Sequence, residues 1–312
     1  MLTMLSADVK SLVLAAGAVA AGVAEAGPVD DMAAETYARW IARGCHGEMG
    51  YLDRYHDVRN DPRLLLDGAV SIVAAAFSYN TVMPEGPLRW ARYAVGTDYH
   101  DEVRRRLTEV AAEITAQTGA QCRVCVDTAP LRERYWASRA GIGFIGLNNL
   151  LIVPGAGSWC VLGFILTTLP LAPDSPCTQG CGECRRCVTA CPGHALDGCR
   201  GMDARRCRSY LTIEYRGDDI PGLGERVYGC DICQEVCPHN RGAAQTGIEG
   251  FAPRPEIVTL GREDILSMRQ EDFSRIFKGS PIKRAKLAGL VRNALRTGRD
   301  AGERGNLGDG QG

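Results

Sequence analysis

The stretch CGECRRCVTACPGHAL, residues 181–196, decides what the cysteine-rich part of this chain can be. Four of its cysteines follow the spacing C-x2-C-x2-C-x3-C, with a proline after the last. Runs of this kind supply thiolate ligands to bacterial [4Fe–4S] clusters. A second run follows in CDICQEVCPHN, residues 230–240, and Cys207 lies between the two. Eight thiolates with two Cys-Pro endings predict two [4Fe–4S] clusters.

The spacing also predicts how the cysteines are shared between the clusters. In two-cluster ferredoxins the fourth cysteine of such a run binds the other cluster. The expected ligand sets are Cys181, Cys184, Cys187 and Cys237 for one cluster, and Cys191, Cys207, Cys230 and Cys233 for the other. The other six cysteines are expected to be mostly small hydrophobic or loop residues. They are Cys45, Cys122, Cys125, Cys160, Cys177 and Cys199.

Two alternatives use the same cysteines differently. Structural zinc sites need paired C-x2-C knuckles, not a third cysteine in the same run. Cys177, Cys181 and Cys184 spell C-x3-C-x2-C, the pattern of radical S-adenosylmethionine enzymes, but that arrangement strands Cys187 and Cys191. Two iron–sulfur clusters account for more of the cysteines than either alternative does.

The composition is that of a globular protein. The chain has 312 residues, 45% of them hydrophobic and 23% charged, with a formal net charge of −1. Cysteines at metal spacings indicate a reducing cytoplasm. The apolar stretch after Lys10 resembles a signal peptide, but Gly17 and Gly22 interrupt it, so we favour a helix at 6–17 and a strand at 20–25. It is too short and interrupted to span a bilayer, and we expect no membrane association.

The remaining pattern predicts an α/β (α+β) fold, with a core of strands and helices ahead of the cysteines. The expected strands are 69–80, 122–127, 149–153 and 159–169, and the expected helices are 98–119 and 131–140. A proline-rich boundary at 170–176 suggests three parts. These are a core at 1–172, a cysteine domain at 173–245, and a helical, basic segment at 246–312 that ends in a disordered tail.

Two features near the end of the core bear on chemistry. Asp127 ends a strand, so it is either a general acid, if burial raises its pKa, or an N-cap for the next helix. GIGFIG at 141–146 matches G-x-G-x-x-G, but a helix precedes it and a strand follows. That order is wrong for a dinucleotide site, although a tight glycine turn can still approach another large ligand.

The C-terminal segment is strongly basic. Eight basic residues and no acid fall between 275 and 299, so the rest of the chain is acidic overall. They are Arg275, Lys278, Lys283, Arg284, Lys286, Arg292, Arg296 and Arg299. A solvated helix face would normally include acids for pairing. The segregation of charge therefore favours a nucleic-acid surface.

Together these parts resemble the epoxyqueuosine reductase family, from about residue 8 to residue 298. The resemblance rests on the cysteine pattern and on the segments 126–152, 157–171, 203–214, 226–240 and 277–294. It implies an enzyme that uses cobalamin and two [4Fe–4S] clusters to remove the epoxide oxygen of epoxyqueuosine in the tRNA anticodon loop. It further implies a mixed-sheet corrin-binding core, a ferredoxin-like domain, an external low-potential electron donor and a monomer. We expect a short form without the C-terminal helical repeats of longer members.

The resemblance also assigns roles to individual residues. Asp127 is implied as proton donor to the epoxide oxygen. The implied cobalamin contacts are Arg59, Ala91, Asn148, Leu151 and Ser158, with Ser209 between cluster and corrin. The implied tRNA phosphate contacts are Lys283, Arg284 and Arg292.

Some residues depart from the family pattern. Leu147 stands where a lysine is common, and Gly193-His194 replaces part of a CPTGA-like ending. No D-x-H-x-x-G occurs, so no histidine of that type would ligate cobalt. Two other hypotheses stay open: a reductive dehalogenase, which uses the same cofactor pair, and a ferredoxin-like electron-transfer protein.

Overall fold

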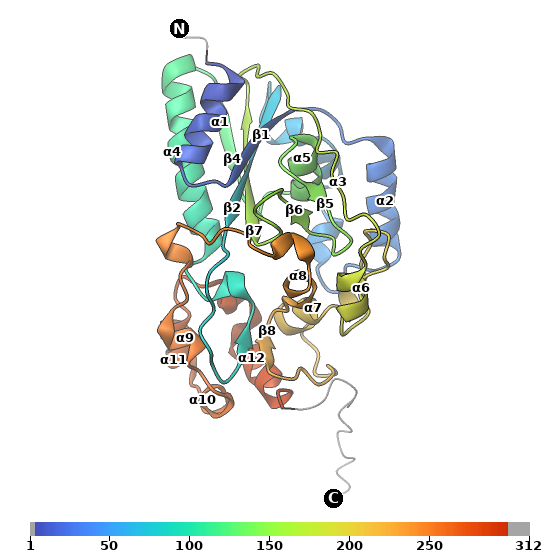
Figure 1. Cartoon of the computed structure of the whole chain (residues 1–312), viewed down its shortest axis with the longest axis vertical. Coiled ribbons are helices and arrows are strands. Elements are labelled where there is room, and N and C mark those ends of the chain that lie inside the picture. Colours follow the sequence, from blue (N-terminus) through green and yellow to red (C-terminus); the bar gives the residue numbers. More distant parts are fainter. Residues whose placement is uncertain (1–3, 299–312) are drawn as a thin grey trace, which may run out of the picture.

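The computed structural model describes residues 4–298, and at its centre four strands form one sheet (Figure 1). In order across the sheet they are β1 (Ala20–Glu25), β2 (Ser71–Ser78), β7 (Cys160–Thr167) and β4 (Cys122–Cys125). Every neighbouring pair in this sheet is antiparallel. Parallel pairing occurs in a separate sheet, between β3 (Arg89–Trp90) and β8 (Arg226–Tyr228). The predicted α/β class is confirmed, with the two kinds of pairing in different sheets.

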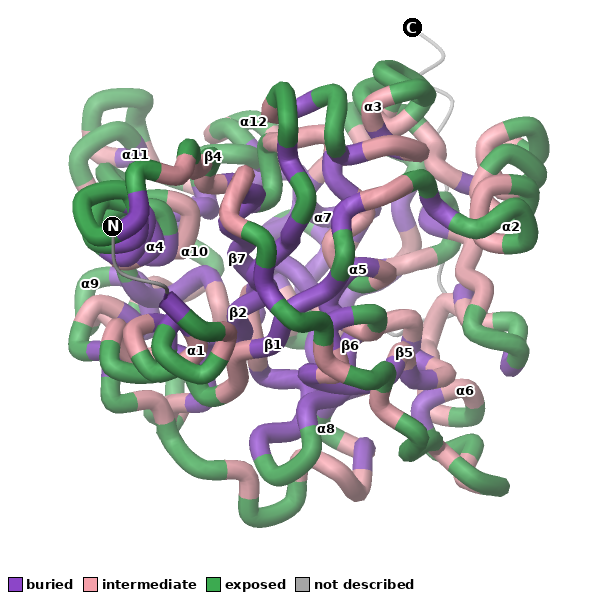
Figure 2. Tube along the Cα trace, turned by 90° about the horizontal axis from the view of Figure 1, so that it is seen from above, coloured by how far each residue is buried: buried purple, intermediate pink, exposed green. Residues whose placement is uncertain are grey.

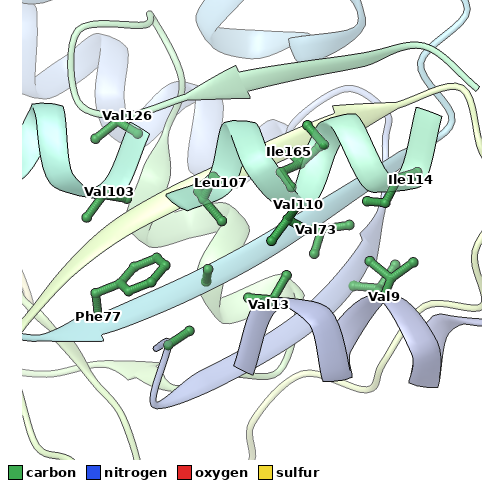
Figure 3. Close-up of a cluster of buried hydrophobic side chains, with 14 of the residues drawn as sticks. Val9, Val13, Val73, Phe77, Val103, Leu107, Val110, Ile114, Val126 and Ile165 are labelled. Carbon is green, nitrogen blue, oxygen red and sulfur yellow. The ribbon is translucent and has the colours of Figure 1, made fainter. Parts of the chain in front are cut away.

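Two helices cover one face of the central sheet (Figure 3). They are α1 (Ser6–Ala15) and α4 (Tyr99–Thr118). Leu107 of α4 is fully buried in the same cluster as Phe77 of β2. Gly163 of β7 allows this close approach, because a Cβ at that position would lie 2.5 Å from Leu107 Cδ1. Packing of α4 on the sheet thus depends on a residue without a side chain.

The other face of the sheet packs against α5 (Glu133–Arg139), through Trp136 and Ala137. All eight residues of β2 are buried, because alternate side chains point into the two clusters. Figure 2 shows the sheet in the buried interior and α2 (Asp31–Ala42), which has no buried residue, at the exposed periphery.

A third hydrophobic cluster joins segments that are far apart in the sequence. It contains Trp90 of β3, Tyr228 of β8 and Phe277 near the end of the chain. The C-terminal helices that pack here are α9 (Pro255–Val258), α10 (Arg262–Leu266), α11 (Gln270–Ile276) and α12 (Lys286–Leu295). This cluster crosses the predicted divisions at 172/173 and 245/246, and those boundaries stay a prediction.

Six short helices and strands lie in the loops that connect the longer elements and in the cysteine region. They are α3 (His56–Asn60), β5 (Phe144–Ile145), β6 (Leu151–Ile152), α6 (Arg186–Ala190), α7 (Arg208–Ile213) and α8 (Ile232–Glu235).

Local sequence signals give the correct boundaries for the longest helix. The Asp98 side chain accepts from the backbone N–H of His100 at 3.0 Å, and Gly119 ends α4 in the left-handed region at φ 75°. The N-terminal stretch forms α1 and β1, as the helix–strand alternative predicts. Among the described residues, no helix is long and apolar enough to cross a membrane. The predicted disordered tail lies outside the described residues.

Candidate active site

The first predicted group of cysteines surrounds one cavity. Its lining includes Cys181, Cys184, Cys187 and Cys237, together with Leu147, Asn148 and Ile152. The backbone N–H of Leu147, which follows the glycine turn, donates to Cys181 Sγ at 3.4 Å. Cys177 is not among the lining residues, but it packs with Cys181 against Phe144, Ile152 and Cys237 beside the cavity. The glycine turn therefore serves this group directly, a role that its motif does not reveal.

The second predicted group is also brought together. Burial, and then the neighbouring thiol of Cys230, raises the pKa of Cys233, and Cys207 adds to this rise. Burial likewise raises the pKa of Cys207, and its neighbouring thiol is Cys191. Cys191 Sγ accepts from the N–H of Ala195 at 3.3 Å. Cys207 thus lies near both Cys191 and Cys233, and the division of the eight cysteines into two ligand sets stays a prediction.

Both groups have features that fit an iron–sulfur cubane. Backbone N–H groups aimed at cysteine sulfur are typical of the turns that hold such clusters. Within residues 4–298, no three His, Cys, Asp or Glu side chains lie close enough to hold a single metal ion. The first group instead encloses a cavity. Cys125 lies outside both groups, on β4, and burial raises the pKa of its thiol to about 11.

Asp127 lies in the loop between β4 and α5, with half of its side chain exposed. Its backbone is in the left-handed region, at φ 47°. Its N–H donates to Glu133 Oε1 at 2.6 Å, so the first turn of α5 holds this loop. The N-cap of α5 is Arg132, and Asp127 therefore does not cap this helix. The N-cap alternative for Asp127 is wrong.

His100 completes a hydrogen-bonded chain of side chains. His100 Nε2 lies 2.9 Å from Asp127 Oδ2, and His100 Nδ1 lies 2.6 Å from Asp98 Oδ1. Burial disfavours the charged ring, but the hydrogen bonds to Asp127 and Asp98 outweigh it and raise the pKa of His100 to about 9. The imidazole is therefore protonated at neutral pH. No sequence motif marks His100 for this role, because its partner Asp127 is 27 residues away in the chain.

Glu133 lies on the other side of Asp127. Desolvation, and then the charge of Asp127, raises the pKa of Glu133 to about 8. At neutral pH this carboxyl group is mostly protonated and adds little negative charge beside Asp127. Asp127 therefore lies between a neutral carboxyl group and a charged imidazole, an arrangement that can hold and transfer a proton.

Aromatic residues and an ion pair surround this chain. Burial, and then the charge of Glu214, raises the pKa of Tyr51 to about 12, and Asp127 also contributes. The Arg284 guanidinium pairs with Glu214 at 2.9 Å and lies 5.4 Å from the Tyr51 ring centroid. The C-terminal segment thus brings a cation into the neighbourhood of Asp127.

The residues implied as cobalamin contacts are largely buried. Ala91, Asn148, Leu151 and Ser158 are each at most 5% exposed. The Ser158 hydroxyl donates to Gln234 Oε1 at 3.0 Å. Asn148 Nδ2 is buried and has no partner among the described residues, so it is available to a ligand.

Two further predicted contacts have a defined setting. Arg59 is buried, and its guanidinium donates to the carbonyl oxygens of Arg54 and Tyr51, each at 3.0 Å. Ser209 is half-buried in the first turn of α7, directly after Cys207 and Arg208. Its position beside the second cysteine group agrees with a place next to a cluster.

The basic C-terminal segment is only partly a surface. Lys283 and Arg284 are exposed, but Arg292 and Arg296 are each 8% exposed. Arg292 donates to the carbonyl oxygens of Leu211, Tyr215 and Gly217, each at 2.7 Å. This geometry contradicts a phosphate contact for Arg292, because its N–H groups are used inside the protein. Arg299 lies outside the described residues.

An α/β core joined to two sets of four cysteines defines an iron–sulfur protein of the two-cluster class. The family model described as epoxyqueuosine reductase QueG, DUF1730, matches residues 59–128. The model described as 4Fe-4S double cluster binding domain matches residues 180–240.

Known proteins identify the family. Epoxyqueuosine reductase of Gloeobacter violaceus is 40% identical over 303 residues, covering 93% of this chain and 94% of the relative. That of Pseudomonas aeruginosa is 38% identical, covering 82% of this chain and 74% of the relative. The chain belongs to the epoxyqueuosine reductase family.

Solved structures of this family share the fold. A crystal structure of epoxyqueuosine reductase with an epoxyqueuosine-modified tRNA-Tyr stem loop is 30% identical, with a TM-score of 0.82 over 93% of this chain and 79% of that chain. A Bacillus subtilis structure is 29% identical, with a TM-score of 0.84 over the same shares of the two chains. In that structure a catalytic loop that carries an aspartate is swung out of the active site.

Proposed function

We propose that this protein reduces epoxyqueuosine to queuosine in the anticodon loop of tRNA. The observation that carries the proposal is the arrangement of Asp98, His100 and Asp127 in a fold that also gathers Cys181, Cys184, Cys187 and Cys237 around one cavity. The relative solved with a modified tRNA stem loop supports the substrate. Removing the epoxide oxygen as water consumes electrons and protons in equal number, and the two parts of the site can supply them.

The cysteine sets would hold two [4Fe–4S] clusters, and the core would hold cobalamin. When bound, these groups would supply single electrons and the reducing chemistry needed for C–O cleavage. Asn148 lines the first cysteine cavity, and its buried amide nitrogen, which has no partner among the described residues, would donate to a group bound there or to cobalamin beside it. Ala91, Leu151 and Ser158 would shape the wall around it through buried surface.

Asp127 would donate a proton to the epoxide oxygen, with His100 as its proton source. His100 Nε2 lies 2.9 Å from Asp127 Oδ2, so the hydrogen bond between them can pass a proton to the carboxylate. Asp98 orients the imidazole ring through its other nitrogen, Nδ1. Because half of the Asp127 side chain is exposed, its second oxygen is free to meet a substrate. The swung-out aspartate loop of the Bacillus subtilis relative supports movement of the loop that carries Asp127.

The tRNA would approach over the start of the C-terminal segment. Lys283 and Arg284 are exposed and would bind phosphates, and the pairing of Arg284 with Glu214 would open or be shared when RNA binds. Arg292 is left out of this surface for the reason given above. We further propose an external low-potential electron donor, a monomer and a cytoplasmic location.

The test is anaerobic turnover of epoxyqueuosine-bearing tRNA by the reconstituted full chain, with mass spectrometry of the digested nucleosides. We expect a nucleoside lighter by one oxygen, and its loss in Asp127→Asn with both clusters retained. Asp53→Asn, which removes the partner of the exposed His56, is the matched control. Loaded enzyme that leaves epoxyqueuosine intact would exclude the tRNA reaction and direct the search to small organohalides. Failure to bind cobalamin would favour an electron-transfer protein.

A further inference from the structure

Arg208 is a buried cation with two donor atoms that have no partner among the described residues. It is the first residue of α7 and follows Cys207 directly. Only 7% of its surface is exposed, yet its Nε and Nη2 have no hydrogen-bond acceptor among residues 4–298. Buried guanidinium groups nearly always bond to acceptors, because an unpaired charge away from water is costly. This side chain is therefore placed for an acceptor that the protein alone does not supply.

The second cysteine group lies next to this guanidinium. Arg208 follows Cys207 in the chain and is buried in the first turn of α7. Arg226 lies on the same side of the group, but Glu235 pairs with it at 2.8 Å. Arg208 also lines a polar cavity of about 400 Å³, together with Arg226 and Arg89. Glu225 and Glu235 line the same cavity, but among residues 4–298 they pair with Arg89 and Arg226, and Arg208 forms no salt bridge.

We propose that Arg208 donates hydrogen bonds from Nε and Nη2 to sulfur atoms of the [4Fe–4S] cluster held by Cys191, Cys207, Cys230 and Cys233, and raises its reduction potential. The inference rests on the proposed ligand set for that cluster. A cluster with four thiolates is negatively charged, and more so after reduction. A nearby cation and N–H···S bonds therefore favour the reduced form. The cluster in turn supplies the missing acceptor and counter-charge.

Arg89 provides a comparison that distinguishes a buried hydrogen-bond donor from a charge that is merely present in the cavity. Arg89 lines the same cavity, but its side chain is mostly exposed and lies 3.5 Å from Glu225. Its charge is screened by water and by that carboxylate. Arg89→Gln is therefore a control that removes a charge from the same cavity without removing a buried donor.

The experiment is a redox titration, followed by electron paramagnetic resonance, of the cluster-loaded full chain carrying Arg208→Gln, Arg208→Lys or Arg89→Gln. In Arg208→Gln we expect one of the two cluster potentials to fall. At the wild-type midpoint, its ratio of reduced to oxidised form should drop about tenfold, which is about 59 mV for a one-electron couple. Arg208→Lys keeps the charge and should shift less, and Arg89→Gln should not shift.

A second measurement does not depend on the variants folding. Wild-type protein labelled with ¹⁵N-arginine should show a nitrogen coupling at one reduced cluster in pulsed resonance, and Arg208→Gln should lose it. Absence of that coupling, unchanged potentials in Arg208→Gln, or an equal shift in Arg89→Gln would overturn the proposal. If Arg208→Gln retains only half of the iron, its potential cannot be compared with the wild type. The proposal is then tested by the nitrogen coupling in the wild-type protein and by the cluster potential of Arg208→Lys. An error in the proposed ligand sets is detected separately, because wild-type protein would then contain less iron than two clusters per chain require.

Discussion

The pKa of His100 is the property of the site that most directly tests its geometry. The hydrogen bonds to Asp127 and Asp98 raise this pKa from 6.5 to about 9, against the opposing effect of burial. Asp127→Asn removes the acceptor with the largest raising effect, and with it a formal negative charge. We expect the His100 pKa to fall by at least about one unit, which corresponds to roughly 1.4 kcal/mol of lost interaction with the charged ring.

Nuclear magnetic resonance of histidine-labelled protein measures this value, and the chain has only five histidines to assign. The His100 signal is identified by its loss in His100→Gln. Asp53→Asn removes a carboxylate that lies 2.9 Å from a different, exposed histidine, and it should leave the His100 titration unchanged. A wild-type His100 that titrates at or below 6.5, or one that does not respond to Asp127→Asn, would refute the proposed proton chain.

The same shift predicts how stability depends on pH. Because the folded pKa of His100 is above its unfolded value, its contribution is complete below about pH 6.5 and is lost as the pH rises through about 9. The shift corresponds to a ceiling of roughly 3 kcal/mol, which solvent around the half-exposed Asp127 reduces. His100→Gln should therefore flatten the fall in unfolding free energy between these pH values. Parallel wild-type and variant curves would contradict this.

Three other outcomes follow from packing and charge. Gly163→Ala should lower the unfolding free energy by roughly 1–3 kcal/mol, because the new Cβ would meet Leu107 Cδ1 at 2.5 Å. In chemical denaturation of Gly163→Ala, Leu107→Ala and the double variant, the losses of the two single variants should not add up in the double variant. Lys283→Gln should weaken tRNA binding, lower by roughly one the slope of the logarithm of the binding constant against the logarithm of the salt concentration, and leave stability unchanged. Arg292→Met should instead lower the unfolding free energy by more than about 2 kcal/mol, because it removes the buried donor to the carbonyl of Leu211. Cys177→Ser should keep both clusters by iron analysis, and loss of one would revive the three-cysteine alternative.

Elements with strong local signals could be predicted from the sequence. The helix α4 has an aspartate cap, a repeating apolar face and a closing glycine, and β2 is an unbroken apolar run. The two-residue strand β3 carries no such signal. It exists because Arg89 and Trp90 pair with Arg226 and Tyr228 of β8, more than a hundred residues later in the chain. Pairing at that distance is set by the tertiary fold, which a local pattern does not encode.

In the candidate site, too, some features follow from local sequence patterns and others depend on the tertiary fold. The double-cluster domain could be predicted because the cysteine spacing of two-cluster proteins is a local sequence pattern. The partnership of His100 with Asp127 was not, because it depends on how the first turn of α4 lies against the loop after β4. The burial of Arg292 was also hidden, since a run of basic residues does not show which of them face the interior.

The interior basic residues give the C-terminal segment a second purpose beside its proposed RNA surface. Arg292 of α12 donates to the carbonyl of Leu211 in α7. The adjacent Asn293 donates to the carbonyls of Thr212 in α7 and Val227 in β8, at 2.8 and 3.0 Å. These two elements lead directly from Cys207 and to Cys230. The helix therefore braces the backbone on both sides of the second cysteine group, which explains why a segment so basic buries part of its charge.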